Sequence, residues 1–516
     1  AGALGSVSLT GLAGETGTFS GGTSGNLFDL AGWTGSATVT GNGGTDTLRA
    51  RDADKTWNLA TNDDNTDVQV PGPDLASGVG GTVGSITFDE ITDMIGGTGN
   101  DTFVIGAGLT ALNSIVDASG TNTIDLRNAA AGQNILLTGL GGGVGFAGSV
   151  GGLVPSFDGI SNLLGAAGTT DVLTGRNANA NWTVGTAGGS YQDTGSGRTL
   201  TFSGIDSLTG GANDDAFNVT SNVTVDISGD IPGGTGADSI SIATDVTLTT
   251  TTAVTLGDGA DSLVLASGAR LVGNVQGDAG NDTFTLGDSA TITGQIQGGA
   301  DSDSLSFAGY TSARSVALTG TTANGFTGTE AAVTAEFTGI DSVIGSAVAT
   351  TDILTGLNNA NALWRLDATN SYEELTGNQV ITFSNFDRLT GGNNAGVGVN
   401  DRFQFGTGVT ESFTLLGNGA TPAVPPVPGP AVPAGFDVVE GSDNADAFSL
   451  TGLNTGSVTV NGRTSSFSNV QSLEGGAGND TFAVSLSGTL TRDIQGGTGT
   501  DTLTGDDNGN VFTVTS

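Results

Sequence analysis

A glycine- and aspartate-rich phrase recurs through the 516 residues of the chain: Gly-Gly-x-Gly-x-Asp, then Thr or Ser, then an apolar residue. Complete copies occupy residues 96–103, 233–240, 475–482 and 496–503. Degenerate copies end at Asp46, Asp215, Asp261, Asp282 and Asp303. From Asp215 through Asp238 to Asp303 the aspartates are spaced by 23, 23, 21 and 21 residues. Units this short cannot bury an apolar face alone, so they must stack on one another, as in a solenoid.

The residues that follow each aspartate alternate between apolar and polar or small, as in Phe103 and Ile105 or Phe284 and Leu286. This period of two indicates strands with one buried face. A chain with 90 glycines and one methionine is also poor in helix formers. We therefore expect an all-β fold, an elongated parallel β-solenoid (β-helix) with coils of about 22 residues and glycine/aspartate turns. Aspartate gaps of 44, 45 and 49 residues are close to two such coils.

A longer repeat overlies the short one. The phrase that begins at Thr170 recurs at Thr351, and Trp57, Trp182 and Trp364 follow related phrases. The tryptophans fit packing residues of one module position, with a sugar-stacking stripe as the alternative. The predicted modules are a partial repeat at 1–45, solenoid modules at 46–170, 171–351 and 352–500, and the start of a further module at 501–516, with a Pro-rich loop at 421–433.

The composition excludes several classes of function. Histidine and cysteine are absent, which removes zinc, haem, disulfide and Ser-His-Asp chemistry. The 52 acidic residues outnumber the 13 basic ones, for a net charge of −39. Such a surface repels nucleic acid and anionic lipid, and no apolar run is long enough for a membrane helix. We therefore expect neither nucleic-acid binding nor membrane insertion.

In stacked coils, the recurring aspartates would lie one above another. Two carboxylates ~4 Å apart repel by ~1 kcal/mol in water and by ~4 kcal/mol at an effective dielectric of 20. Calcium could compensate this charge, since it prefers six to eight oxygen ligands. The alternative is a metal-free Asn/Asp ladder, in which each side chain accepts a hydrogen bond from a turn N–H. The predicted calcium-site residues are Asp46, Asp101, Asp215, Asp238, Asp261, Asp282, Asp303, Asp480, Asp501, Gly97, Gly99, Gly234, Gly236, Gly476 and Gly478.

The phrase Gly-Gly-x-Gly-Asn-Asp-Thr-Phe resembles the nonapeptide of the RTX proteins, which are secreted bacterial proteins with calcium-binding β-rolls. The longer modules resemble those of giant repetitive bacterial adhesins and surface-filament proteins. RTX nonapeptides run in tandem, whereas here one copy occurs per coil of about 22 residues. This departure favours a three-sided β-helix with one glycine corner over a two-sided β-roll.

These observations predict a structural, non-enzymatic protein: the calcium-stabilised shaft of a secreted, cell-surface bacterial adhesin, filament or matrix fibre. Neither end shows a polar cap, so we expect either a longer chain or subunits that associate with themselves head to tail. One alternative is a calcium-dependent carbohydrate- or ice-binding protein with a Thr-rich face at 247–252, for which surface polysaccharide would be the partner. Another is a β-helical polysaccharide lyase or epimerase, although the chain has no histidine and three tyrosines.

Overall fold

The computed structural model of the chain describes residues 6–8, 15–61, 79–109, 112–166, 168, 170–229, 234–348, 351–393, 399–417 and 436–506. The predicted Pro-rich loop at 421–433 lies outside these ranges. The described residues form strands and turns but no helix, which confirms the all-β prediction. The chain divides into two compact units, one of residues 1–241 with 246–258 and the other of residues 242–245 with 259–516. Each is described by itself.

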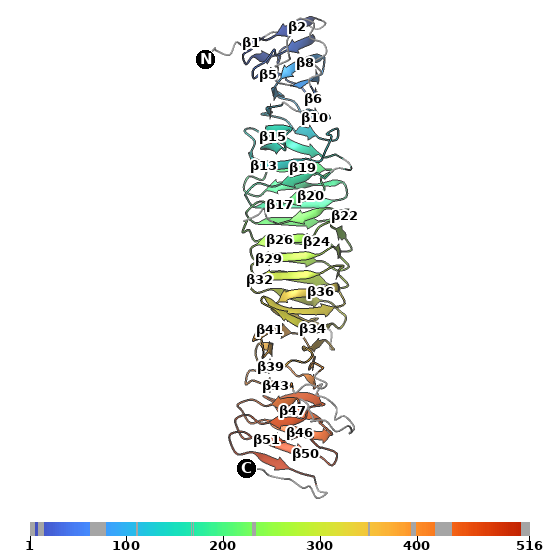
Figure 1. The fold of residues 1–516 in the computed structure, drawn as a ribbon, viewed down its shortest axis with the longest axis vertical. Coiled ribbons are helices and arrows are strands. Elements are labelled where there is room, and N and C mark those ends of the chain that lie inside the picture. Colours follow the sequence, from blue (N-terminus) through green and yellow to red (C-terminus); the bar gives the residue numbers. More distant parts are fainter. Residues whose placement is uncertain are drawn as a thin grey trace, which may run out of the picture. The chain divides into compact units, whose positions relative to one another are not determined.

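Three strands make one coil, as two successive coils of the second unit show. Figure 1 labels one strand from each of these two coils, β29 (Val275–Ala279) and β32 (Ile296–Ala300). In parallel register Leu263 lies beside Phe284, Leu271 beside Ile292, and Val275 beside Ile296, each pair 21 residues apart. The fold is therefore a parallel β-solenoid with three sides, as predicted. The strands of these two coils are β27 (Ser262–Leu265), β28 (Arg270–Val272), β29 (Val275–Ala279), β30 (Thr283–Gly287), β31 (Thr291–Ile292) and β32 (Ile296–Ala300).

The core is a set of inward-facing columns, one residue from each coil. In the second unit, one column continues from Leu263 and Phe284 through β33 (Ser304–Gly309), β37 (Ser342–Ile344) and β41 (Gln379–Ser384). Its further members are Leu305, Val343 and Phe383, and all five side chains are buried. The alternation seen in the sequence thus places apolar side chains inside and their neighbours outside.

Some coils contain an extra antiparallel strand. Because of these strands, the prediction that each long gap between recurring aspartates spans two coils is wrong. In the first unit β18 (Gly188–Asp193) pairs antiparallel with both β17 (Ala180–Gly185) and β19 (Thr199–Ser203). The next parallel partner of β16 (Val172–Thr174) is β20 (Ser207–Thr209), so one coil takes 35 residues. The 44-residue gap therefore joins aspartates on different sides: Asp215, at the start of β21 (Asp215–Val219), lies beside Ala180 and not above Asp171.

The tryptophans are packing residues, as the sequence favoured. Trp57, Trp182 and Trp364 are each fully buried. Each stacks on the phenylalanine two residues after an aspartate in the next coil, with ring centroids 5.2–5.6 Å apart and interplanar angles of 15–23°. A buried stripe cannot stack on a sugar. The partner phenylalanines are Phe103, Phe217 and Phe403.

Candidate functional site: the aspartate ladder

The recurring aspartates form short ladders of hydrogen bonds between coils. The N–H of Asp261 donates to Oδ1 of Asp282 at 2.9 Å, and the N–H of Asp282 donates to Oδ1 of Asp303 at 2.9 Å. In the first unit, the N–H of Asp215 donates to Oδ1 of Asp238 at 2.6 Å. Each carboxylate therefore accepts the turn N–H of its counterpart one coil earlier, which is the bond that the metal-free alternative requires.

Related bonds join the other predicted aspartates to neighbouring coils, although at Asp101 only the backbone N–H takes part. The Asp46 carboxylate accepts the N–H of Asn26 at 2.8 Å, and the N–H of Asp101 donates to Oδ1 of Asn122 at 3.0 Å. The N–H of Asp480 donates to Oδ1 of Asp501 at 3.0 Å. Eight of the nine predicted aspartates are at most 2% exposed, and Asp501 is half-buried. The predicted aspartates thus occupy buried turn positions that repeat from coil to coil, as in Asp261, Asp282 and Asp303.

The first glycine of the phrase makes room for the aspartate five residues later. A Cβ on Gly277 would lie 2.2 Å from Oδ2 of Asp282, and a Cβ on Gly298 would lie 2.4 Å from Oδ2 of Asp303. Both distances are shorter than any real contact, so no larger residue fits there. The carboxylate is therefore buried against the glycine backbone. Its Oδ1 accepts an N–H of the neighbouring coil, and its Oδ2 lies over the glycine.

The predicted glycines have two other roles. Gly97, Gly476 and Gly478 adopt φ between 95° and 126°, which disfavours residues with a side chain. Gly99 and Gly236 lie so close to the preceding coil that a Cβ would approach a backbone carbon within 2.3–2.6 Å. Gly234 is a buried residue of the same turn as Gly236. The glycine corner therefore provides positive φ at some positions and close approach of backbones at others.

Asparagine, one residue before the aspartate, forms a second ladder that runs the opposite way. The N–H of Ser302 donates to Oδ1 of Asn281 in the preceding coil at 2.9 Å. The N–H of Thr121 and that of Thr500 donate in the same sense to Asn100 and Asn479, at 2.7 and 2.8 Å. The buried aspartates reach N–H groups of the coil before, and the exposed asparagines reach those of the coil after. The Asn-Asp pair thus satisfies turn donors in both directions.

Sequence reasoning missed a group of aspartates that extend the ladders where a coil carries an extra strand. The N–H of Asp303 donates to Oδ2 of Asp341 at 3.0 Å. Asp171 donates in the same way to Asp206, and Asp352 to Asp387, both at 3.0 Å. The signal was present: each of the three acceptors follows an Ile or Phe in the recurring phrases at 204–208, 339–343 and 385–389.

Burial changes the acidity of the ladder. Burial, together with the smaller effect of the negative charges of Asp261, Asp303 and Asp278, raises the pKa of Asp282 to about 7, although the hydrogen bond from the Asp261 N–H lowers it. Burial also raises the pKa of Asp303 to about 6. Removing a carboxylate from water disfavours its charged form. At mildly acidic pH these carboxyls therefore hold protons that exposed aspartates release.

The ladder aspartates are not gathered into clusters of acidic side chains among the described residues. Across the described ranges, no group of three or more Asp, Glu, His or Cys side chains is placed to hold a metal ion. The ladder aspartates already use one oxygen as an N–H acceptor, whereas calcium takes six to eight oxygens. Calcium binding by the fifteen predicted residues stays a prediction, and the observed bonds are those of the metal-free alternative.

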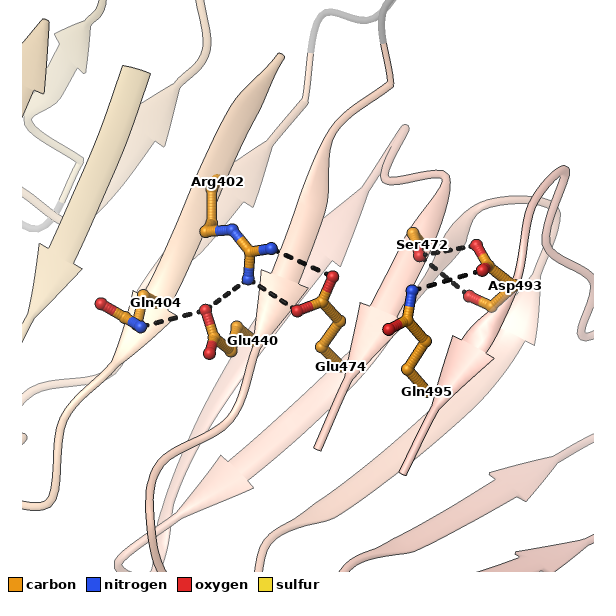
Figure 2. A network of polar contacts seen from close by, with 7 residues as sticks. All are labelled: Arg402, Gln404, Glu440, Ser472, Glu474, Asp493 and Gln495. Atoms are coloured by element: carbon orange, nitrogen blue, oxygen red, sulfur yellow. Dashed lines mark hydrogen bonds and ion pairs between the residues drawn. The ribbon is translucent and has the colours of Figure 1, made fainter. Parts of the chain in front are cut away.

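A second polar array lies on the outer face of the second unit (Figure 2). Arg402 on β43 (Asp401–Phe405) contacts Glu440 on β45 (Val438–Glu440) at 2.5 Å and Glu474 on β49 (Ser472–Glu474) at 2.7 and 3.1 Å. Gln404 donates to the same Glu440 oxygen at 3.0 Å. One guanidinium therefore joins three successive coils and offsets part of the negative charge of two stacked glutamates.

The glycine-rich segment at 143–148, which spells Gly-x-Gly-x-x-Gly, is part of a turn and not a phosphate loop. It joins β13 (Asn134–Leu140) to β14 (Phe146–Val150). The Arg198 guanidinium donates to the carbonyl oxygens of Gly141, Gly143 and Gly145 at 2.6–3.2 Å. Carbonyls turned toward an arginine cannot cradle a phosphate, which needs N–H donors.

No protein-family model matches the chain, and no curated protein matches its sequence. Within the described part of the chain, no helix is long and apolar enough to cross a membrane.

Proposed function

We propose that this chain forms the shaft of an extracellular bacterial adhesin, surface filament or matrix fibre. The observation that carries the proposal is that the aspartate, tryptophan and arginine side chains described above make contacts within and between the coils. The ladder aspartates accept N–H groups of neighbouring coils, the tryptophans fill the core, and Arg402 links three coils. Residues that catalysis or ligand binding would use thus hold coils together, which favours a structural, non-catalytic role.

The parallel stack also favours growth along its axis. Each coil offers the next one a row of backbone donors and acceptors, and parallel stacking has no built-in limit. Continuation within a longer chain and head-to-tail association of separate chains both extend the shaft. The surrounding charge of −39 then keeps neighbouring shafts apart sideways.

A Thr-rich binding face at 247–252 is less well supported. The hydroxyl of Thr251 donates to Asp226 at 2.6 Å, and the N–H groups of Thr251 and Thr252 donate to the same carboxylate at 2.6 and 3.0 Å. These threonines serve an inter-coil contact. Polysaccharide or ice binding has no observation of its own among the described residues.

Electron microscopy of the purified chain, together with its mass in solution, tests the proposal. We expect particles that associate end to end and leave their sides free. A discrete 50.5 kDa monomer without end-to-end association would contradict the shaft.

The same samples with and without chelator test calcium separately. Calcium bound only to the folded state would add roughly 2.7 kcal/mol at a hundredfold excess over Kd. A clear fall in Tm on chelation supports calcium. An unchanged Tm supports the metal-free ladder and leaves the shaft proposal intact.

A further inference from the structure

The glycine-rich turn at 141–145 in the first unit directs three carbonyl oxygens toward one guanidinium. Nη1 of Arg198 donates to the Gly141 carbonyl at 2.6 Å and to the Gly145 carbonyl at 3.0 Å, and Nη2 donates to the Gly143 carbonyl at 3.2 Å. The N–H of Gly141 closes the turn by donating to the Gly145 carbonyl at 3.1 Å. Together the carbonyl oxygens of Gly141, Gly143 and Gly145 form a carbonyl cradle around one cation.

Arg198 binds neutral oxygens in a chain that is rich in carboxylates. The chain has 52 acidic residues and 13 basic ones. Within the described ranges six arginines form ion pairs with Asp or Glu, and Arg198 is not among them. A guanidinium presents five N–H donors in a planar fork, which suits several acceptors at fixed positions. The position of the carbonyl oxygens therefore decides where the Arg198 side chain lies.

The glycines of the turn make this arrangement possible. A Cβ on Gly141 would lie 2.0 Å from the Val144 carbonyl oxygen, and a Cβ on Gly143 would lie 2.0 Å from the Ala118 carbonyl oxygen. Both distances are too short for any real contact. Gly145 adopts a φ of 54°, which disfavours residues with a side chain. The shape of the turn therefore requires glycine at all three positions of the carbonyl cradle.

The longer sequence repeat supplies a natural comparison in the second unit, where both halves of the contact differ. Gln379 stands at the position of Arg198 in the recurring phrase, and the turn at 321–325, Thr-Thr-Ala-Asn-Gly, takes the place of the glycine-rich turn. In that turn the Thr322 hydroxyl donates to the Gly325 carbonyl at 3.2 Å, so the carbonyl is satisfied from within the turn. Arginine thus accompanies the glycine-rich turn and glutamine accompanies the threonine turn. This pairing indicates that Arg198 and the carbonyl cradle belong together.

We propose that the carbonyl cradle is a binding site selective for a guanidinium group, which Arg198 fills from the following coil. Three acceptors at fixed positions suit the two terminal nitrogens of a planar fork better than the single nitrogen of an ammonium group. The contact spans 53–57 residues of sequence and joins the turn before β14 to the residue before β19. It therefore fastens together two coils that each carry an extra strand, β14 in one and β18 in the other.

Chemical rescue of the full chain tests this site. Arg198→Ala empties the carbonyl cradle and keeps the glycine-rich turn, and Gln379→Ala is the matched control at the equivalent position of the second unit. Thermal unfolding is followed by circular dichroism in guanidinium chloride or sodium chloride at equal concentrations, well below those that unfold proteins. We expect Arg198→Ala to lower the Tm and guanidinium, but not sodium, to restore part of the loss, because a ligand that binds only the folded state stabilises it. Wild type and Gln379→Ala should gain nothing from guanidinium.

Equal responses of Arg198→Ala and Gln379→Ala to guanidinium would overturn the proposal. If Arg198→Ala is unfolded in sodium chloride, its folded fraction is measured as guanidinium is added, and a failure to recover the fold counts equally against the site. Arg198→Lys tests the selectivity, since a Tm equal to that of wild type would show that an ammonium fills the carbonyl cradle as well. Calcium chloride is the last comparison: rescue of Arg198→Ala by calcium and not by guanidinium would make the turn a metal site and contradict a guanidinium site.

Discussion

The backbone N–H of Asp282 lies 2.9 Å from Oδ1 of Asp303, its counterpart 21 residues later in the chain and one coil away. The side-chain carboxyl of Asp282 in turn accepts the N–H of Asp261 at 2.9 Å. One residue type therefore acts as donor through its backbone and as acceptor through its side chain. This double role explains why the aspartate recurs at the coil period: each copy satisfies the turn of its neighbour.

Asp282→Ala, which removes the carboxyl, should destabilise the fold more than Asp282→Asn, which removes only its charge. Asp282→Ala leaves the buried N–H of Asp261 without its acceptor, which costs about 1–3 kcal/mol. Asp282→Asn keeps an Oδ1 acceptor and removes a buried charge, so its Tm at pH 8 should equal or exceed that of wild type. Thermal unfolding followed by circular dichroism measures both. Asp301→Asn, at an exposed turn position, is the control and should stay within about 0.5 kcal/mol of wild type. An Asn variant as unstable as the Ala variant would show that the ladder needs the charge.

Stability should fall as the pH rises toward neutrality. The folded-state pKa of Asp282 is about 7 and that of Asp303 about 6, above the ordinary aspartate pKa of 3.8. Between these values the folded state binds protons that the unfolded chain has lost, so raising the pH weakens folding. Each unit of pKa difference corresponds to roughly 1.4 kcal/mol. We expect the Tm to be higher at pH 5 than at pH 8, and Asp282→Asn to reduce this difference. A Tm that rises steadily from pH 5 to pH 8 would contradict the protonated ladder.

The fold could be predicted from the sequence because its two periods have separate physical origins. The alternation of Phe284 and Leu286 fixes which face is buried, and the spacing of Asp282 and Asp303 fixes the coil length. Both signals are local and repeat many times. The three-sided architecture and the packing role of Trp182 followed from them.

The extra strands could not be predicted in the same way. β18 adds Gly188–Asp193 to one coil without changing its parallel neighbours, so the aspartate spacing alone cannot distinguish two coils from one enlarged coil. The direction of the ladder bonds was also beyond sequence reasoning. Whether the carboxylate of Asp282 meets N–H groups or cations depends on backbone geometry around Gly277, which no residue pattern reveals.

The glycine that faces the aspartate should tolerate no side chain. A Cβ on Gly277 would lie 2.1 Å from the Gly298 carbonyl oxygen and 2.2 Å from Oδ2 of Asp282, so Gly277→Ala must push two coils apart. Overpacking of this kind costs about 1–3 kcal/mol or more. Gly452→Ala is the matched control, because its nearest neighbour would be a Thr455 carbon at 3.7 Å. We expect Gly277→Ala to lower the Tm clearly and Gly452→Ala to leave it unchanged or raise it. Equal effects would show that close approach at Gly277 is relieved without cost.

Arg402 should contribute more to stability than an arginine that bonds a single carboxylate. Its side chain is 35% exposed, and it bonds Glu440 and Glu474 from two further coils, which hold stacked negative charges on one face (Figure 2). Arg402→Gln removes the positive charge and leaves the two glutamates to repel each other. Exposed pairs are worth about 0.2–1 kcal/mol, and a network with a bidentate carboxylate lies toward the upper end of that range. Arg365→Gln is the control, since the Arg365 guanidinium is 52% exposed and bonds one carboxylate, that of Glu373 at 3.1 Å, besides the Gln404 amide oxygen at 3.3 Å. We expect Arg402→Gln to lower the Tm more than Arg365→Gln at low salt.

The difference should shrink at high salt, because screening weakens both the lost attraction and the glutamate repulsion. A salt-independent difference would assign the effect of Arg402 to packing of its aliphatic stem.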